Sequence, residues 1–220
     1  MGATNGVGFA DERAELDLHT GTHIDSLGHC CSGDLMFNRM PVLEVAGNFG
    51  LMKLGIEKLP PIITRGVLID VAAFRGRELN PGEEITEADI KQTLEWEGVT
   101  LQPGALVLIR TGWERYYMTD NARYIGPAPG PGVEAADWLA RQQVVAVGSD
   151  TMVLEVMPLD AAKMDYPVHQ HLLANSGVYI LENAKLSEIS EQRVYDFCCF
   201  CLAPRFEGAT GIPIRLLAAV

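Results

Sequence analysis

The chain has 220 residues, of which 48% are hydrophobic and 21% are charged, a composition typical of a globular protein with one sizeable core. Its net charge of −12, without a cluster of Lys and Arg, argues against a nucleic-acid partner, because phosphate binding needs concentrated positive charge. The sequence has no apolar run of about 18 residues and no basic-then-apolar leader, so neither a membrane span nor a secretory signal is expected.

Five short apolar runs, rich in β-branched or aromatic residues and bounded by Gly, Pro or polar residues, predict strands. They are Gly66–Val71, Ala105–Arg110, Val144–Val147, Val178–Leu181 and Val194–Leu202. Helical segments fall between them, and such alternation is typical of an α/β protein. Without an evident linker, a single domain over residues 1–220 is expected.

Three helices are predicted between these strands. The first, Thr86–Gly98, opens with a Thr cap and an acidic turn and closes at a glycine. The second, Pro131–Gln142, begins with proline in its first turn, and a short third helix covers His169–Ala174. The segment Asn121–Pro131, with several Gly and Pro residues, is predicted to be a loop.

The five cysteines stand in two tight groups, which does not suggest a secreted disulfide framework, and a cytoplasmic location is expected. Alternation along the last strand places Cys199 and Cys201 on one face and Cys198 on the other. Free cysteines usually behave as small buried hydrophobes, and that is the expectation for these three.

The segment His19–His29, with the sequence HTGTHIDSLGH, concentrates metal-binding side chains. It holds three of the five histidines together with the carboxylate of Asp25, and such nitrogen and oxygen donors suit Zn²⁺ and Mn²⁺. In a straight strand His19 and His23 would be about 13 Å apart, so a bend at Gly21 is needed to bring them together. His29 follows a second flexible glycine, Gly28, and is expected to approach from another side.

Three donors without cysteine favour a catalytic centre, because structural zinc is usually closed by four ligands. Such a site activates water and polarises a carbonyl group, and a nearby imidazole such as His29 can move the proton. We therefore expect His19, His23 and Asp25 to bind the metal and His29 to act as the acid/base group.

The pattern HxGTHxDxxxH in His19–His29 resembles that of the cyclase-type metal hydrolases, which include bacterial kynurenine formamidase and isatin hydrolase. Further stretches fit the same family in the same order. They are Gly66–Val71 (GVLIDV), Leu108–Trp113 (LIRTGW), Val147–Glu155 (VGSDTMVLE), Pro167–Leu173 (PVHQHLL), Gly177–Asn183 (GVYILEN) and Gly208–Gly211 (GATG).

The resemblance implies an α/β fold of the swivelling β/β/α type with a mixed sheet, assembled as a homodimer or homotetramer. It also implies that His169 and Glu182 complete a second metal position bridged by Asp25, although the sequence does not decide between one ion and two. His171, two residues from His169, is expected to be a surface or helix residue.

The implied activity is hydrolysis of a small amide, such as an aryl formamide or a lactam. A metal-dependent lyase or cyclase-type enzyme is the alternative. Family members carry more chain before the first metal histidine than the eighteen residues here, so a shortened N-terminus is expected, and a catalytically impaired metal-binding module remains a third hypothesis.

Three further residues are candidates for substrate binding. Asp150 and Thr151 follow a strand at its carboxyl end, where ligand sites of α/β folds form, although a turn or helix cap is an equal alternative. Trp113 could line an aromatic pocket or belong to the core.

Overall fold

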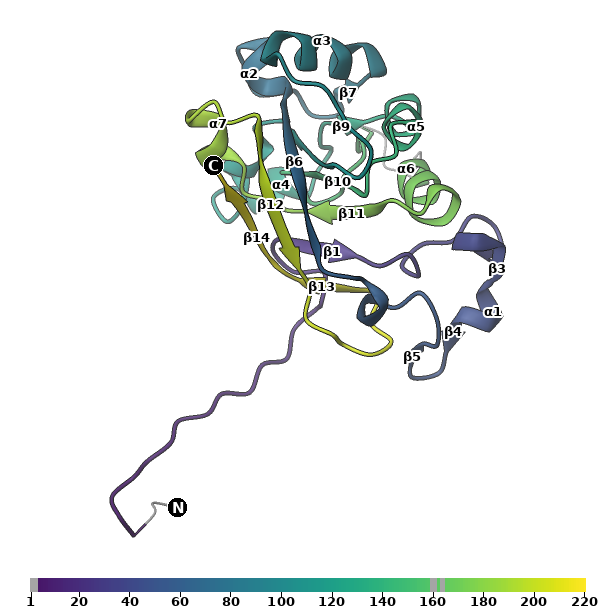
Figure 1. Cartoon of the computed structure of the whole chain (residues 1–220), viewed down its shortest axis with the longest axis vertical. Helices are drawn as coiled ribbons and strands as arrows, with labels where there is room; N and C mark the ends of the chain where they lie inside the picture. The colour runs from purple at the N-terminus through teal and green to yellow at the C-terminus, as the bar shows by residue number, and fades with distance from the viewer. Residues whose placement is uncertain (1–3, 159–161, 163–164) are drawn as a thin grey trace.

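The computed structural model describes residues 4–158, 162 and 165–220, and a curled mixed sheet of eight strands forms its centre (Figure 1). From one edge to the other the strands are β13 (Gly211–Pro213), β1 (His23–Asp25), β11 (Tyr179–Glu182), β10 (Ala146–Ser149), β8 (Leu106–Arg110), β6 (Ile62–Asp70), β12 (Asp196–Leu202) and β14 (Arg215–Ala219). The four central strands are parallel to one another, and the two outer strands on each side join them in antiparallel pairs. The chain is therefore a mixed α/β domain, as predicted.

Short strand pairs and helices surround this sheet. The pairs are β2 (Leu35–Met36) with β3 (Met40–Pro41), β4 (Ala46–Gly47) with β5 (Gly50–Leu51), and β7 (Glu84–Ile85) with β9 (Gly130–Pro131). The α-helices are α1 (Val42–Val45), α2 (Val71–Arg75), α3 (Glu87–Glu97), α4 (Asn121–Tyr124), α5 (Val133–Arg141), α6 (Pro167–His169) and α7 (Ser187–Glu191). Short 3₁₀ turns cover Phe37–Arg39, Ile56–Lys58 and Trp113–Tyr116, and a π-helix, η5 (Gln170–Ser176), continues α6.

Alternating side chains of the central strands supply two separate cores, one on each face of the sheet. On one face, Val107 of β8 and Ile180 of β11 pack with Leu139 of α5 beneath the helices. On the other face, Leu108 and Leu181 pack with apolar residues of β1, β12 and β13 inside the curl of the sheet. Because both faces are covered, the central strands are nearly continuous apolar runs, which is why the sequence predicts them well.

Helix α3 shows how closely local sequence signals match the structure. The Thr86 side chain accepts a hydrogen bond from the Asp89 backbone N–H, and the Asp89 carboxylate accepts one from the Thr86 N–H. Gly98 ends the helix with a left-handed φ of 69°, a conformation that glycine adopts without strain. The predicted capping and termination are confirmed.

Other predictions need correction. Helix α5 begins at Val133, because Pro131 pairs with Ile85 in the β7–β9 ribbon instead of opening the helix. The predicted loop from Asn121 contains helix α4, whose first turn is capped by the Asp120 carboxylate. The third helix is longer than predicted and takes π geometry after His169, and strands β13 and β14 had no clear sequence signal.

Figure 1 shows that the segment before β1 leaves the sheet and extends away from the rest of the chain. Residues 4–17 of this segment are all exposed. Among the helices of the described residues, none has the length and apolarity that crossing a membrane requires.

We predict that Gly148→Ala destabilises the sheet next to the candidate site. An added Cβ would lie 2.8 Å from Cβ of Leu181 and 3.0 Å from Cδ2 of Leu108. Such overpacking costs about 1–3 kcal/mol, measurable by urea unfolding. Gly8→Ala, where nothing lies within 4 Å of the added atom, is the matched control, and equal midpoints for both variants would contradict the prediction.

Candidate metal centre

Strand β1 presents the first donors because the chain bends just before it. Gly21 has a φ of +62°, so the predicted bend is present. His23 and Asp25 then share the helix-covered face of the sheet, while Ile24 between them is buried in the opposite core. The flexibility expected of Gly28 is not used, since its φ is not positive; a Cβ there would lie 2.5 Å from the Leu51 side chain.

The register of β1 against β11 places a second carboxylate beside His23. His23 and Glu182 are direct cross-strand partners, and Nε2 of His23 lies 3.3 Å from Oε2 of Glu182. The same nitrogen lies 3.5 Å from Oδ1 of Asp25. Two strands thus direct one imidazole and two carboxylates at a common point.

His169 reaches this point from the helix layer. It is the last residue of α6, directly before the π-helix, a geometry often found at functional sites. Its Nε2 lies 3.2 Å from Oε1 of Glu182 and 3.8 Å from Oδ2 of Asp25. His169 and Glu182, which lie more than half of the chain after β1 in the sequence, therefore join the cluster; their role as metal ligands stays a prediction.

His19 completes the cluster from the turn before β1. Its Nδ1 lies 2.8 Å from Oδ1 of Asp25, and its Nε2 is hydrogen-bonded to Oγ1 of Thr210 at 2.9 Å. The ring packs on the backbone of Gly211, where an added Cβ would lie 2.5 Å from the imidazole. Thr210 and Gly211 belong to the GATG stretch, whose contribution the sequence analysis did not assign.

A residue that the sequence analysis missed orients His169. The carboxylate of Glu155, 1% exposed, is hydrogen-bonded to Nδ1 of His169 and accepts a second bond of 2.9 Å from the backbone N–H of Val168. A carboxylate behind a metal-binding histidine fixes the ring and leaves the other nitrogen free for the metal. Glu155 ends the VGSDTMVLE stretch, but only the folded chain places it behind His169.

His23 is oriented in the same way by a backbone carbonyl. Its Nδ1 lies 2.8 Å from the carbonyl oxygen of Gly21, a contact that requires the proton on Nδ1. The lone pair is then on Nε2, which faces the two carboxylates. The three imidazoles of the cluster therefore have three different partners on their far nitrogens: a hydroxyl, a carbonyl and a carboxylate.

The donor atoms at the centre lack partners within the described part of the chain. Asp25 is 0% exposed, yet neither of its oxygens accepts a hydrogen bond, although His19 Nδ1 lies close to one of them. Nε2 of His23 is also buried and without a hydrogen bond. Buried polar atoms normally have partners, so this cluster fits a cation that would satisfy all of them.

The spacing of the donors fits a small divalent cation as well. Ligand atoms about 2 Å from a tetrahedral cation are about 3.3 Å apart, and the contacts of Glu182 with His23 and His169 measure 3.3 and 3.2 Å. Within the described residues, two groups of donors each lie within 4.8 Å: one is His19, His23 and Asp25, the other Asp25, His29 and His169. Asp25 is common to both groups.

The carboxylates that lie close to the imidazoles change the pKa values of two histidines in the cluster. Burial lowers the pKa of His23, but the nearby negative charges of the Glu182 and Asp25 carboxylates outweigh burial, and the net pKa is raised. The pKa of His169 is raised well above its usual value by Glu155 and Glu182 against the effect of burial. Because ligand nitrogens must be unprotonated, cation binding has to displace protons from these rings.

His29 lies beside the cluster but keeps solvent-exposed surface. Its ring centroid is 4.3 Å from that of His19 and 6.2 Å from that of His169. Partial burial of the ring, together with the neighbouring imidazoles, lowers the pKa of His29 despite the opposing charge of Asp25. A neutral imidazole at the open side of the cluster can accept a proton, and it also lies near enough to act as a ligand.

Two of the candidate substrate residues, Trp113 and Thr151, are fully buried. Trp113 is 0% exposed, and its indole N–H donates to the carbonyl of Tyr124 at 3.3 Å. The Thr151 hydroxyl is equally buried and donates to the carbonyl of Val153 at 2.7 Å. Both side chains make structural contacts, and their role in substrate binding stays a prediction.

Asp150 borders a cavity of about 690 Å³ whose lining includes Tyr124, Asn183 and Thr22. Its carboxylate accepts hydrogen bonds from the backbone and hydroxyl of Thr111 and from the Gly112 N–H, so it organises the loop after β8. Asp150 therefore has the structural role in a turn that was the alternative to substrate binding. Its contact with a substrate stays a prediction. His171 lies outside the cluster, 3.3 Å from a carboxylate oxygen of Asp137 on α5.

A family model described as "Putative cyclase" matches residues 4–156, more than half of the chain. The chain belongs to the cyclase family. The matched range includes β1 with its donors, His29 and Glu155, while His169 and Glu182 follow it in sequence. No curated protein matches the chain in sequence.

Solved structures agree with this membership. The crystal structure of a novel cyclase is 30% identical, with a TM-score of 0.89, and the match covers 99% of this chain and 75% of that one. Isatin hydrolase A from Ralstonia solanacearum is 27% identical with a TM-score of 0.69, over 91% of this chain and 72% of that one. A potential metal-dependent hydrolase with cyclase activity, 23% identical over 94% and 81% of the two chains (TM-score 0.61), shows the shared fold alone.

We predict that Asp25→Asn abolishes stabilisation by metal. In the unchanged protein, a cation at 100 times its dissociation constant would stabilise the fold by about 2.7 kcal/mol, seen as a higher melting temperature than in EDTA. The variant should lose this rise in melting temperature, because an amide lacks the negative charge of the Asp25 carboxylate that three imidazoles surround. Asp11→Asn, on the exposed N-terminal segment, should keep it; an unchanged metal effect in Asp25→Asn would contradict the prediction.

We also predict that Glu155→Gln weakens metal binding about 10- to 100-fold, as loss of a histidine-orienting carboxylate typically does. The dissociation constant can be measured by competition with a chromophoric chelator. Glu134→Gln makes the same charge change on the exposed side of α5 and should bind as the unchanged protein does. Equal affinities for the two variants would show that Glu155 does not support His169.

Proposed function

We propose that the chain is a divalent-metal-dependent hydrolase of small amides, with His19, His23, Asp25, His169 and Glu182 as metal ligands. The observation that carries the proposal is the fully buried Asp25 carboxylate, which is surrounded by imidazoles and accepts no hydrogen bond from any residue that the structure describes. Membership of the cyclase family and similarity to an isatin hydrolase support the hydrolase assignment. The nitrogen and oxygen donors suit Zn²⁺ or Mn²⁺.

When bound, such a cation would lower the pKa of a water ligand and stabilise negative charge on a carbonyl oxygen. The chain's own residues then have separate tasks. His23 and His169 present their Nε2 atoms because Gly21 and Glu155 engage their Nδ1 atoms. His29, at the exposed side of the cluster, is placed to accept a proton from water and to release it again.

In the proposed reaction one water molecule is consumed. Its oxygen bonds to the carbonyl carbon, the C–N bond breaks, and the proton that His29 takes from the water is delivered to the leaving nitrogen. The products are a carboxylic acid and an amine. A neutral His29 is needed for the first proton transfer, which agrees with the lowered pKa of this side chain.

We further propose an aryl formamide or a lactam as the substrate. Isatin is itself a cyclic aromatic amide, and the similarity to isatin hydrolase A favours compounds of this class. A screen of formylated aromatic amines and fused lactams, with the metal-loaded protein, tests the class directly. Assembly into a homodimer or homotetramer and a cytoplasmic location stay predictions.

We predict that His29→Ala lowers turnover by about 10²- to 10⁴-fold, the usual contribution of an acid/base group. The metal content of the purified variant should equal that of the unchanged protein. Loss of one equivalent of metal would instead assign His29 as a ligand of the second donor group. Full turnover with full metal content would remove His29 from the mechanism.

Products formed in ¹⁸O-labelled water separate hydrolysis from lyase or cyclase-type chemistry. Hydrolysis puts one solvent oxygen into the carboxylic acid, whereas a lyase reaction does not. Metal-dependent stabilisation without turnover of any amide in the screen would support a catalytically impaired metal-binding module and contradict the proposed hydrolase.

A further inference from the structure

The cavity of about 690 Å³ lies where the central parallel strands end. Its wall includes Arg110, the last residue of β8, together with Asp150 and Asn183, which directly follow β10 and β11. In open α/β sheets, ligands bind outside the carboxyl ends of the parallel strands, and this volume is in the range of small-molecule pockets. The proposed metal ligands and His29 are not among its described lining residues, so the reaction proposed above leaves the cavity unexplained.

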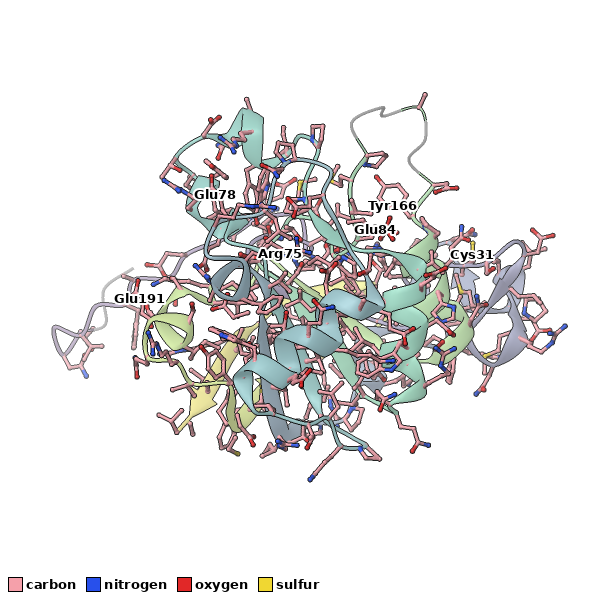
Figure 2. The ribbon with its side chains drawn as sticks, turned by 90° about the horizontal axis from the view of Figure 1, so that it is seen from above. Cys31, Arg75, Glu78, Glu84, Tyr166 and Glu191 are labelled. Carbon is pink, nitrogen blue, oxygen red and sulfur yellow. The ribbon has the colours of Figure 1, made fainter. Side chains whose placement is uncertain are left out.

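This cavity is separate from the exposed side of the metal cluster. Figure 2 shows Glu78, which lines the cavity, well apart from Tyr166 and Cys31. Tyr166 lies beside His169, with ring centroids 5.9 Å apart, and so belongs to the surroundings of the cluster. A molecule bound in the cavity would therefore occupy a site of its own.

Two tyrosines give the cavity an aromatic wall. The rings of Tyr117 and Tyr124 pack edge to face, with centroids 5.3 Å apart and an interplanar angle of 72°. Tyr124 is 4% exposed, and its hydroxyl donates to Oδ1 of Asn183 at 2.7 Å, which fixes this ring. Tyr117 is 43% exposed, so part of its ring surface is available for packing against an aromatic ligand.

The lining of the cavity includes three basic and three acidic side chains. They are Arg110, Arg115, Lys185, Glu78, Glu114 and Asp150. Arg115 donates to Glu78 at 2.7 Å. Lys185 pairs with Glu188, and the Asp150 carboxylate accepts hydrogen bonds from the loop after β8. Arg110 and Glu114 are therefore the charged groups of the lining that have the most hydrogen-bonding capacity left.

Arg110 and Glu114 lie side by side, with side chains 20% and 13% exposed. Arginine has five N–H donors, and in the described part of the chain only one from Nη1 of Arg110 has a hydrogen bond, to the Asp70 carboxylate at 3.0 Å. Nε of Arg110 and Oε1 of Glu114 are 3.7 Å apart, and neither is hydrogen-bonded to any described residue. The guanidinium suits a carboxylate, and the Glu114 oxygen suits an N–H donor.

The charges around Arg110 favour a ligand that carries both kinds of group. Arg110 stands between the carboxylates of Asp70 and Glu114, whose negative charge offsets its own and would repel a simple anion. An amine that donates to Glu114 would compensate for this repulsion. Hydrolysis of an aryl-fused lactam yields such a molecule, because ring opening leaves the carboxylic acid and the amine on one aromatic product.

We propose that this cavity is a second small-molecule site, which binds an aromatic compound that carries a carboxylate and an amine. The carboxylate binds Arg110, the amine donates to Glu114, and the ring packs against Tyr117. The identity of this ligand as the product of the reaction rests on the proposed function. The site itself does not, since its residues are not the proposed metal ligands.

The probe for this site is 2-aminobenzoate, a fluorescent compound whose adjacent amine and carboxylate match the adjacent Glu114 and Arg110. Binding is followed by the emission of the probe in EDTA-treated protein, so that a cation cannot attract the carboxylate. We expect saturable binding. Benzoate and aniline, which each lack one of the two groups, should displace the probe about 10-fold less well or worse.

Two variants test the proposed contacts. Arg110→Lys keeps the positive charge but loses the guanidinium fork, and we expect it to weaken probe binding about 10-fold. Tyr117→Leu removes the aromatic wall and should weaken binding about 3- to 10-fold. The matched controls are Arg141→Lys on α5 and Tyr166→Leu, because Tyr166 is 44% exposed and Tyr117 is 43% exposed. Both controls should bind the probe as the unchanged protein does.

A melting curve shows whether each variant is folded, and the two test variants alter different elements, so one of them suffices if the other unfolds. Absence of saturable probe binding, or equal affinity in the test and control variants, overturns the inference. Weakening by Tyr166→Leu alone also overturns it, because the probe would then lie beside the metal cluster. Failure of every amide in the screen, with probe binding that Arg110→Lys weakens, would overturn the proposed function but support this site.

Discussion

The candidate site depends on one costly arrangement, the complete burial of an aspartate among imidazoles. Burying a charge away from water is unfavourable unless opposite charge or hydrogen bonds compensate for it. Asp25 has no hydrogen bond in the described structure, so its only compensation is the imidazoles around it or a cation between them. The apolar cores on both faces of the sheet stabilise the fold and so offset the unfavourable burial of Asp25.

The donors come from parts of the fold that are fixed independently of one another. The β1–β11 register places His23 opposite Glu182. The end of α6 determines the position of His169, and the turn before β1 determines that of His19. Each imidazole is then oriented from behind by a partner of its own. A site assembled in this way is rigid, because moving any donor would disturb a strand pairing or a helix end as well as a contact with the cluster.

The sequence predicts the central strands, helix α3 and the donors of β1, because each depends on local patterns: buried apolar runs, a capping box and closely spaced histidines. It does not predict the residues that orient those donors. Glu155 lies 14 positions before His169, and Thr210 lies 191 positions after His19. Their roles exist only in the folded chain, where long-range packing decides which carboxylate or hydroxyl comes to lie behind which ring. The π-helix after His169 was missed for a similar reason, since packing selects its geometry.

Asp25 belongs to both donor groups, so two cations bound at the site would share its carboxylate. Two cations held against one carboxylate repel each other and compete for its electron density, so occupation of one position reduces the affinity of the other. Filling would then be sequential, with a tight and a weak step, and the predominant form of the protein would change with the free concentration of the ion. The environment of the protein, as well as its sequence, would decide how many ions it carries.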